Sequence, residues 1–175
     1  MRARLSGGRP GRLALLVTAA AYVVALAWAA AVLPERVPSH FDAAGRVDDW
    51  SSRPAALVAW AGIGVLVLGG IPLLTRALSA GDGRWVNLPP GWKDHWFAPE
   101  RRAEFRDRLQ DDTEASTALT GVLLLAVLGL TTWVGTTGRD EVPWWVLAGL
   151  VGGYLALTAA WALRVRARYR PPGVS

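Results

Sequence analysis

The sequence has no cysteine and only two histidines, His40 and His95. The chain therefore has no disulfide, no thiolate zinc site, no iron–sulfur cluster and no cysteine nucleophile. Two imidazoles are also too few for a multi-histidine metal site or proton relay. Charge is scarce as well, since 19% of the 175 residues are charged and 52% are hydrophobic. This balance excludes a disordered chain and is too apolar for an ordinary soluble domain.

Charge is missing altogether from four long stretches, residues 13–33, 55–75, 115–135 and 144–163. A helix of about 20 residues spans roughly 30 Å, the thickness of the hydrocarbon core of a bilayer. Insertion of a single charged residue at the centre of a membrane helix costs about 2.5–3.5 kcal/mol. The absence of charge from all four stretches therefore indicates transmembrane helices. The sequence predicts an all-α membrane protein with four transmembrane helices, forming one domain over residues 1–175. The first stretch exceeds the usual length of about 7–15 residues for the apolar part of a signal peptide, so we expect it to be retained.

Basic residues are distributed unevenly around these spans. Of the 19 Lys and Arg residues, 15 lie in the N-terminal leader, the C-terminal tail and the long loop of residues 76–114. The positive-inside rule therefore predicts that both termini and this loop are cytoplasmic. The loop has seven basic and eight acidic residues, which argues against nucleic acid as a partner. A single Lys against 18 Arg, with many Ala and Gly, indicates a GC-rich genome and hence a bacterial plasma (inner) membrane.

Small residues and proline predict features of helix packing. Gly149 and Gly153 form a G-x-x-x-G in the fourth span, and a stripe in the first span consists of Ala21, Ala25 and Ala29. Such residues allow close approach of helices in lipid. The run from Gly69 to Pro72 predicts a kink in the second span. The third and fourth spans should be antiparallel neighbours, because the loop between them is short.

The loop of residues 34–54 is predicted to be a hairpin-like structure outside the membrane. Asp42 and Gly45 stand at the first and fourth positions expected of a type I turn, with apolar residues on both sides. In one interpretation Asp42 caps the turn, His40 bonds a backbone carbonyl, and Arg46 or Arg53 neutralises Asp48. Alternatively, His40 and the carboxylates hold a divalent ion, or the loop recognises a partner or a lipid headgroup. The candidate ligand or partner residues are Pro38, His40, Phe41, Asp42, Gly45, Asp48, Trp50 and Arg53.

This loop also carries a resemblance to a known family. Between two apolar spans the loop has the pattern Pro38-x-His40-Phe41-x-x-x-Gly45-x-x-Asp48-x-Trp50-x-Ser52-Arg53. With this pattern, residues 13–75 resemble the domain of unknown function 1648. That membrane domain is also found at the N-terminal part of immunity proteins against a sporulation-delaying killing peptide. The resemblance implies a multi-pass bacterial membrane protein without demonstrated catalysis. Four spans leave out the full C-terminal region of the immunity proteins.

Within the loop of residues 76–114 stand Asn87-Leu88-Pro89 and, further on, Trp96-Phe97-Ala98-Pro99-Glu100-Arg101-Arg102. This stretch resembles the cytoplasmic segment that often follows the domain. We expect Pro89-Pro90-Gly91 to break any helix and the aromatic residues to lie at the headgroup level. An amphipathic surface helix should begin at Pro99 and lead into the third span. Residues 115–163 should form a second hairpin of two spans. A docking site for a soluble partner is the alternative. The candidate partner or membrane-interface residues are Trp85, Asn87, Pro89, Trp92, Trp96, Phe97, Pro99, Arg101 and Arg102.

Together these features predict a non-enzymatic multi-pass membrane binding or regulatory protein, with immunity against a membrane-active killing peptide as one concrete form. The alternative is a small transporter or channel-like subunit that acts as an oligomer. No ionisable residue lies within a span, which weakens that alternative. We predict no catalytic residue, no metal site and no cofactor. The expected partners are the lipid bilayer, a peptide toxin or membrane protein, and a second copy of the chain.

Overall fold

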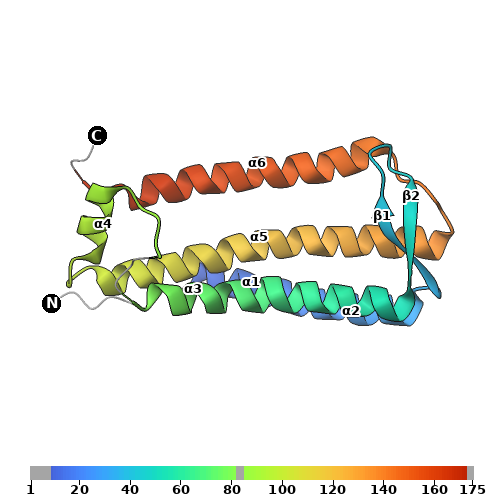
Figure 1. Cartoon of the computed structure of the whole chain (residues 1–175), viewed down its shortest axis with the longest axis horizontal. Helices are drawn as coiled ribbons and strands as arrows, with labels where there is room; N and C mark the ends of the chain where they lie inside the picture. Colours follow the sequence, from blue (N-terminus) through green and yellow to red (C-terminus); the bar gives the residue numbers. More distant parts are fainter. Residues whose placement is uncertain (1–8, 82–84, 173–175) are drawn as a thin grey trace.

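A computed structural model of the chain describes residues 9–81 and 85–172. It is an elongated helical bundle with a two-stranded sheet at one end and a short helix, α4, at the other (Figure 1). We call these the hairpin end and the α4 end. Within the described residues, four helical stretches are long and apolar enough to cross a membrane: Pro10–Val32, Arg53–Ser79, Arg102–Thr137 and Trp144–Tyr169. They contain the four predicted spans except Leu33, so the prediction of four apolar helices of membrane-spanning length is confirmed. Arg2 and Arg4 of the basic leader lie outside the described residues.

Helices α1 (Pro10–Val32) and α5 (Arg102–Thr137) pack against each other, and the predicted stripe of α1 matches the packed face only in part, since Ala25 and Ala29 lie against the core. Ala29 is fully buried, whereas Ala21 is exposed. The buried face of α1 consists of Gly11, Leu15, Thr18, Tyr22 and Ala29. The strict spacing of four was therefore wrong, because a helical face alternates between spacings of three and four.

The second span has an irregular centre. It consists of α2 (Arg53–Gly64), a π-helical turn η1 (Val65–Gly70) and α3 (Ile71–Ser79). A π-helix pairs residues five apart instead of four, and such turns mark places where the regular ladder is disturbed. Pro72 follows directly and lacks a backbone N–H. The predicted irregularity is therefore present, as a widened turn that begins a few residues before the glycine–proline run.

Helix α6 (Trp144–Tyr169) runs antiparallel beside α5, as predicted (Figure 1). The Thr120 hydroxyl of α5 and the Tyr154 hydroxyl of α6 lie 3.0 Å apart. The expected G-x-x-x-G contact is absent, however: Gly149 and Gly153 are exposed, and a Cβ at either would meet nothing within 4 Å. Tyr169 is the one buried residue of the helix. Gly149 and Gly153 therefore make no close helix contact within the described part of the chain.

The predicted hairpin is present. Strands β1 (Arg36–Phe41) and β2 (Val47–Ser52) pair antiparallel, and the Gly45 N–H donates to the Asp42 carbonyl at 2.9 Å. Gly45 has a φ of +88°, which favours glycine. The turn also bonds the α5–α6 connection, since the Val142 N–H donates to the Gly45 carbonyl at 2.8 Å. The hairpin therefore closes one end of the bundle.

The segment around α4 corrects two predictions. Helix α4 (Pro90–Phe97) begins within the Pro-Pro-Gly run, because proline is well accommodated in the first turn of a helix. The helix expected from Pro99 begins instead at Arg102, after a turn in which the Arg101 N–H donates to the Ala98 carbonyl at 3.0 Å. No separate surface helix follows. Helix α5 continues unbroken for 36 residues, because no glycine or proline interrupts it before the apolar span.

Candidate functional site

The hairpin's Asp42 serves its own turn. Its Oδ1 accepts the N–H groups of Ala44 and Arg46, each at 2.9 Å, and its Oδ2 lies 2.9 Å from the Arg46 guanidinium. The backbone hydrogen bond from Arg46, with the other bonds to the carboxylate, holds the pKa of Asp42 below its ordinary value. The capping interpretation of Asp42 is therefore confirmed. Arg46 was expected to neutralise Asp48 and instead pairs with the cap.

His40 pairs with a side chain rather than with a backbone carbonyl. Its Nδ1 lies 2.6 Å from Oδ1 of Asp48 on the facing strand. The neighbouring Ser39 points to Asp49, whose Oδ2 accepts its hydroxyl at 3.0 Å. Among the residues that the structure describes, no three His, Asp or Glu side chains gather into a possible metal site. The exposed carboxylates therefore stabilise the hairpin in pairs.

The other hairpin candidates join the sheet to the helices or cover its surface. Arg53 Nη1 donates to the Leu33 carbonyl at 3.2 Å and so ties the start of α2 to the end of α1. Trp50 is 36% exposed and lies beneath the Arg36 guanidinium, 5.4 Å from ring centroid to Cζ. Pro38 lies opposite Trp50, and Phe41 opposite Val47, in the strand register. These contacts give each residue a role in building the hairpin.

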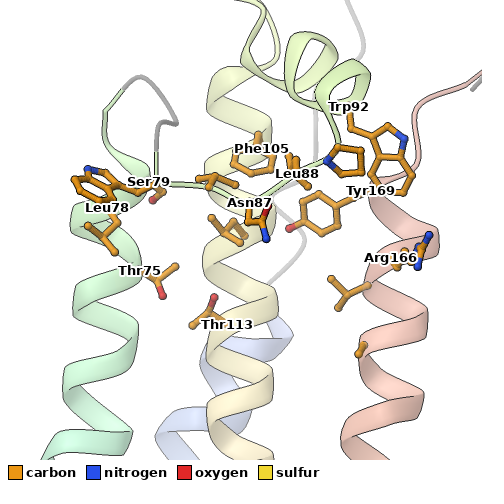
Figure 2. Close-up of a pocket in the computed structure, with 16 residues that line it drawn as sticks. Thr75, Leu78, Ser79, Asn87, Leu88, Trp92, Phe105, Thr113, Arg166 and Tyr169 are labelled. Carbon is orange, nitrogen blue, oxygen red and sulfur yellow. The ribbon is translucent and has the colours of Figure 1, made fainter.

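The candidates of the 76–114 loop lead to a cavity at the α4 end. It has a volume of about 900 Å³ and lies between α3, α5 and α6, beneath the chain that connects α3 to α4 (Figure 2). Four predicted residues line it, namely Trp85, Asn87, Pro89 and Trp92. We call it the tryptophan-lined cavity. The structure thus brings residues of the predicted loop together with residues of three spans.

The walls of this cavity are mostly apolar. Helix α3 contributes Thr75, Leu78 and Ser79, helix α5 Phe105, Leu109 and Thr113, and helix α6 Ala162, Val165, Arg166 and Tyr169. Figure 2 shows the Asn87 side chain in front of α5, between α3 and α6. Within the described residues, the side chains of Asn87 and Arg166 have no hydrogen bond or ion pair. The cavity therefore combines a large apolar surface with an unpaired amide and an unpaired guanidinium.

An aromatic cluster contributes Phe105 and Tyr169 to one wall of the cavity and continues behind that wall. Trp96, Phe105 and Tyr169 are 5%, 1% and 4% exposed, and their ring centroids lie 5.7–5.9 Å apart. The Trp96 Nε1–H donates to the Tyr169 carbonyl at 2.7 Å. Trp96 of α4 is thus buried against α5 and the end of α6, and its level relative to the lipid headgroups stays a prediction. Phe97 also belongs to the cluster, and its ring centroid lies 5.0 Å from that of Phe105.

Polar contacts fix the same region. The Arg168 guanidinium of α6 donates to Oδ1 of Asp112 at 2.6 Å, and Asp112 is 5% exposed. Arg102 donates to the Phe97 carbonyl at 3.1 Å, and Arg101 lies 3.1 Å from His95 Nδ1. Arg101, Arg102 and His95 therefore brace the turn between α4 and α5. Pro99 lies in that turn.

Sequence reasoning identified only the loop side of the cavity. The span residues were missed because each lies in an apolar run whose orientation depends on how the helices pack. Arg166 was counted only as part of a basic tail. Arg166 stands three residues before the aromatic Tyr169, and this spacing places both side chains on the same face of a helix.

The helices, the hairpin cap and the cavity define a multi-pass helical membrane protein with a preformed pocket at one end. Residues 16–65 match the family model described as Domain of unknown function (DUF1648). The match runs from α1 through the hairpin and α2 to the first residue of η1, within the residues 13–75 for which the resemblance was predicted. No curated protein and no solved structure matches the chain.

Proposed function

We propose that this chain is a non-enzymatic binding protein of the bacterial plasma membrane and that its binding site is the tryptophan-lined cavity. In the most concrete form of this proposal, the protein binds the apolar part of a membrane-active killing peptide and so protects the cell in which the protein is made. The single observation that carries the proposal is the cavity of about 900 Å³ between α3, α5 and α6. Pockets that bind ligands usually have volumes of about 300–1,000 Å³ and are mostly apolar with a few polar groups.

The polar groups favour a peptide as the ligand. The Asn87 amide has donors and an acceptor, and within the described residues none of them is paired. A peptide backbone offers both partners to such an amide, whereas a hydrocarbon tail offers neither. Trp85 and Trp92 supply large rings of the kind that dominate binding energy at interfaces. The aromatic cluster behind the cavity holds the wall in place before the ligand arrives, which lowers the cost of binding.

The proposal includes an orientation in which the N terminus, the C terminus and the α4 end are cytoplasmic. The uneven distribution of basic residues supports it. A reporter enzyme fused after Arg53 should then be active outside the cytoplasm, and one fused after Arg76 should be active inside. The reverse pattern would refute the orientation.

A protection experiment tests the function. The gene is deleted and restored as wild type, as Ala162→Trp, or as Ala160→Trp, and each strain is challenged with killing peptides from its own and neighbouring strains. Ala162 lines the cavity, whereas Ala160 is exposed on α6 and does not. Tryptophan at position 162 should place its indole in the cavity, obstruct the ligand and so reduce protection, and tryptophan at position 160 should leave protection intact.

The same strains separate the cavity from the hairpin. A His40→Ala/Asp42→Ala variant, present at the wild-type level, should still protect, because those side chains are paired within the hairpin. Equal survival of the deletion strain and the wild type under every peptide would refute immunity. Protection lost only in the hairpin variant would move the binding site to the other end of the bundle.

A further inference from the structure

A second cavity lies at the α4 end, between α1, α3 and α5. Its volume is about 580 Å³, and it is lined by four arginines, Arg9, Arg12, Arg76 and Arg106, together with the carboxylates of Asp107 and Glu114. We call it the arginine-lined cavity. Its charged side chains carry a net positive charge, and they come from three separate helical regions. Side chains that are far apart in the sequence are thus gathered around one space.

Three of the four guanidinium groups have no ion-pair partner among residues 9–81 and 85–172. Glu114 Oε2 lies 3.5 Å from the Arg9 guanidinium. Within the described residues, the guanidinium groups of Arg12, Arg76 and Arg106 have no hydrogen bond or ion pair. Asp107 follows Arg106 directly in the helix, and consecutive helical residues do not face each other. Unpaired guanidinium groups around one space favour an anion, and their fork of donors matches the oxygens of a phosphate.

The cavity lies where three apolar spans meet their charged flanks. The charge-free run of α1 begins one residue after Arg12, that of α3 ends one residue before Arg76, and that of α5 begins one residue after Glu114. These three positions therefore lie at one level, the boundary between hydrocarbon and headgroups. A phosphate group at this level belongs to the membrane lipid itself.

The same cavity continues into the apolar region. Leu15, Leu16 and Leu73 line it together with the arginines, and Leu16 and Leu73 are 57% and 68% exposed. A free phosphate would contact only the guanidinium part of this wall. A phospholipid would use both parts, with its phosphate at the arginines and an acyl chain along the leucines.

We propose that the arginine-lined cavity binds one anionic phospholipid, with the headgroup phosphate held by Arg12, Arg76 and Arg106. Basic pockets between transmembrane helices are suited to such headgroups. The lipid would join α1, α3 and α5 at their charged ends, in addition to the side-chain contacts already present. Of its lining residues this cavity shares only Ser79 with the tryptophan-lined cavity, so the proposed lipid site does not depend on the proposed function.

Native mass spectrometry of the full chain, purified in a non-ionic detergent, tests the proposal with three probes: phosphatidylglycerol, phosphatidylcholine and inorganic phosphate. Phosphatidylglycerol should bind one molecule per chain more tightly than phosphatidylcholine. An Arg12→Gln/Arg76→Gln/Arg106→Gln variant should weaken this binding about tenfold or more, since charge-assisted hydrogen bonds are lost. The control variant Arg139→Gln/Arg164→Gln/Arg170→Gln removes the same charge from exposed positions and should bind as the wild type does.

Two results would overturn the proposal. Equal affinity of both triple variants for phosphatidylglycerol would show that attraction is general and that no site is built. Binding of inorganic phosphate as tight as that of the lipid would show that the leucines contribute nothing. If the first triple variant does not fold, Arg76→Gln alone decides the question, because Arg76 is exposed and its loss should still weaken lipid binding severalfold.

Discussion

Substitution of Gly45 by alanine tests how the hairpin is held to the bundle. At a φ of +88° an alanine is strained by about 1–2 kcal/mol. A Cβ at this position would also lie 1.9 Å from the Val142 carbonyl oxygen, so the α5–α6 connection must move away. That movement breaks the hydrogen bond from the Val142 N–H to the Gly45 carbonyl, which contributes about 1 kcal/mol. The expected loss of stability is therefore about 2–3 kcal/mol.

Gly138→Ala is the matched control, because Gly138 also has a positive φ, +66°, but a Cβ there meets nothing within 4 Å. An alanine at position 138 therefore costs only the backbone strain of about 1 kcal/mol. For a chain of this size 1 kcal/mol shifts the melting temperature by about 2–4 °C. Thermal unfolding in detergent should therefore show a shift about twice as large for Gly45→Ala, with faster hydrogen exchange at the Val142 amide. Equal shifts, with unchanged exchange, would refute the docking of the turn.

Three further predictions concern ion pairs and the aromatic cluster. Because the folded pKa of Asp42 is lowered, its contribution to stability is present above its ordinary pKa and is lost as the pH falls through the lower, folded value; Asp42→Asn should therefore melt below the wild type at pH 7, by a difference that shrinks in acid. Arg168→Met should destabilise by about 1–3 kcal/mol in chemical unfolding, since it leaves the buried Asp112 unpaired, and adding Asp112→Asn should recover part of the loss; strictly additive losses would argue against the pair. Trp96→Phe should cost about 1–3 kcal/mol, because the buried Tyr169 carbonyl loses its donor while the ring packing is largely kept, and an unchanged melting temperature would contradict that account.

The sequence was most informative where a property repeats along the chain. Four charge-free runs of the right length predicted the four spans, and Asp42 with Gly45 predicted the turn of the hairpin. Both features depend on neighbouring residues alone. The resemblance then added the relation between the hairpin and the first two spans, which the family match over residues 16–65 supports.

Packing between distant residues was beyond this reasoning. Nothing near Trp96 in the sequence indicates that its indole N–H meets the carbonyl of Tyr169, 73 residues away. The G-x-x-x-G of α6 indicated a contact that the fold does not use. Arg46 had two carboxylates within reach, and the choice of Asp42 depends on the shape of the turn.

Direct binding of a peptide at the tryptophan-lined cavity is the most decisive measurement. The killing peptide that is most toxic to the deletion strain is labelled with a fluorophore and titrated against the protein in phospholipid nanodiscs, by fluorescence anisotropy. The account predicts saturable binding to the wild type and to Ala160→Trp, and at least about tenfold weaker binding to Ala162→Trp, because the indole occupies the cavity. Equal affinity for all three proteins would contradict the claim that this cavity is the binding site.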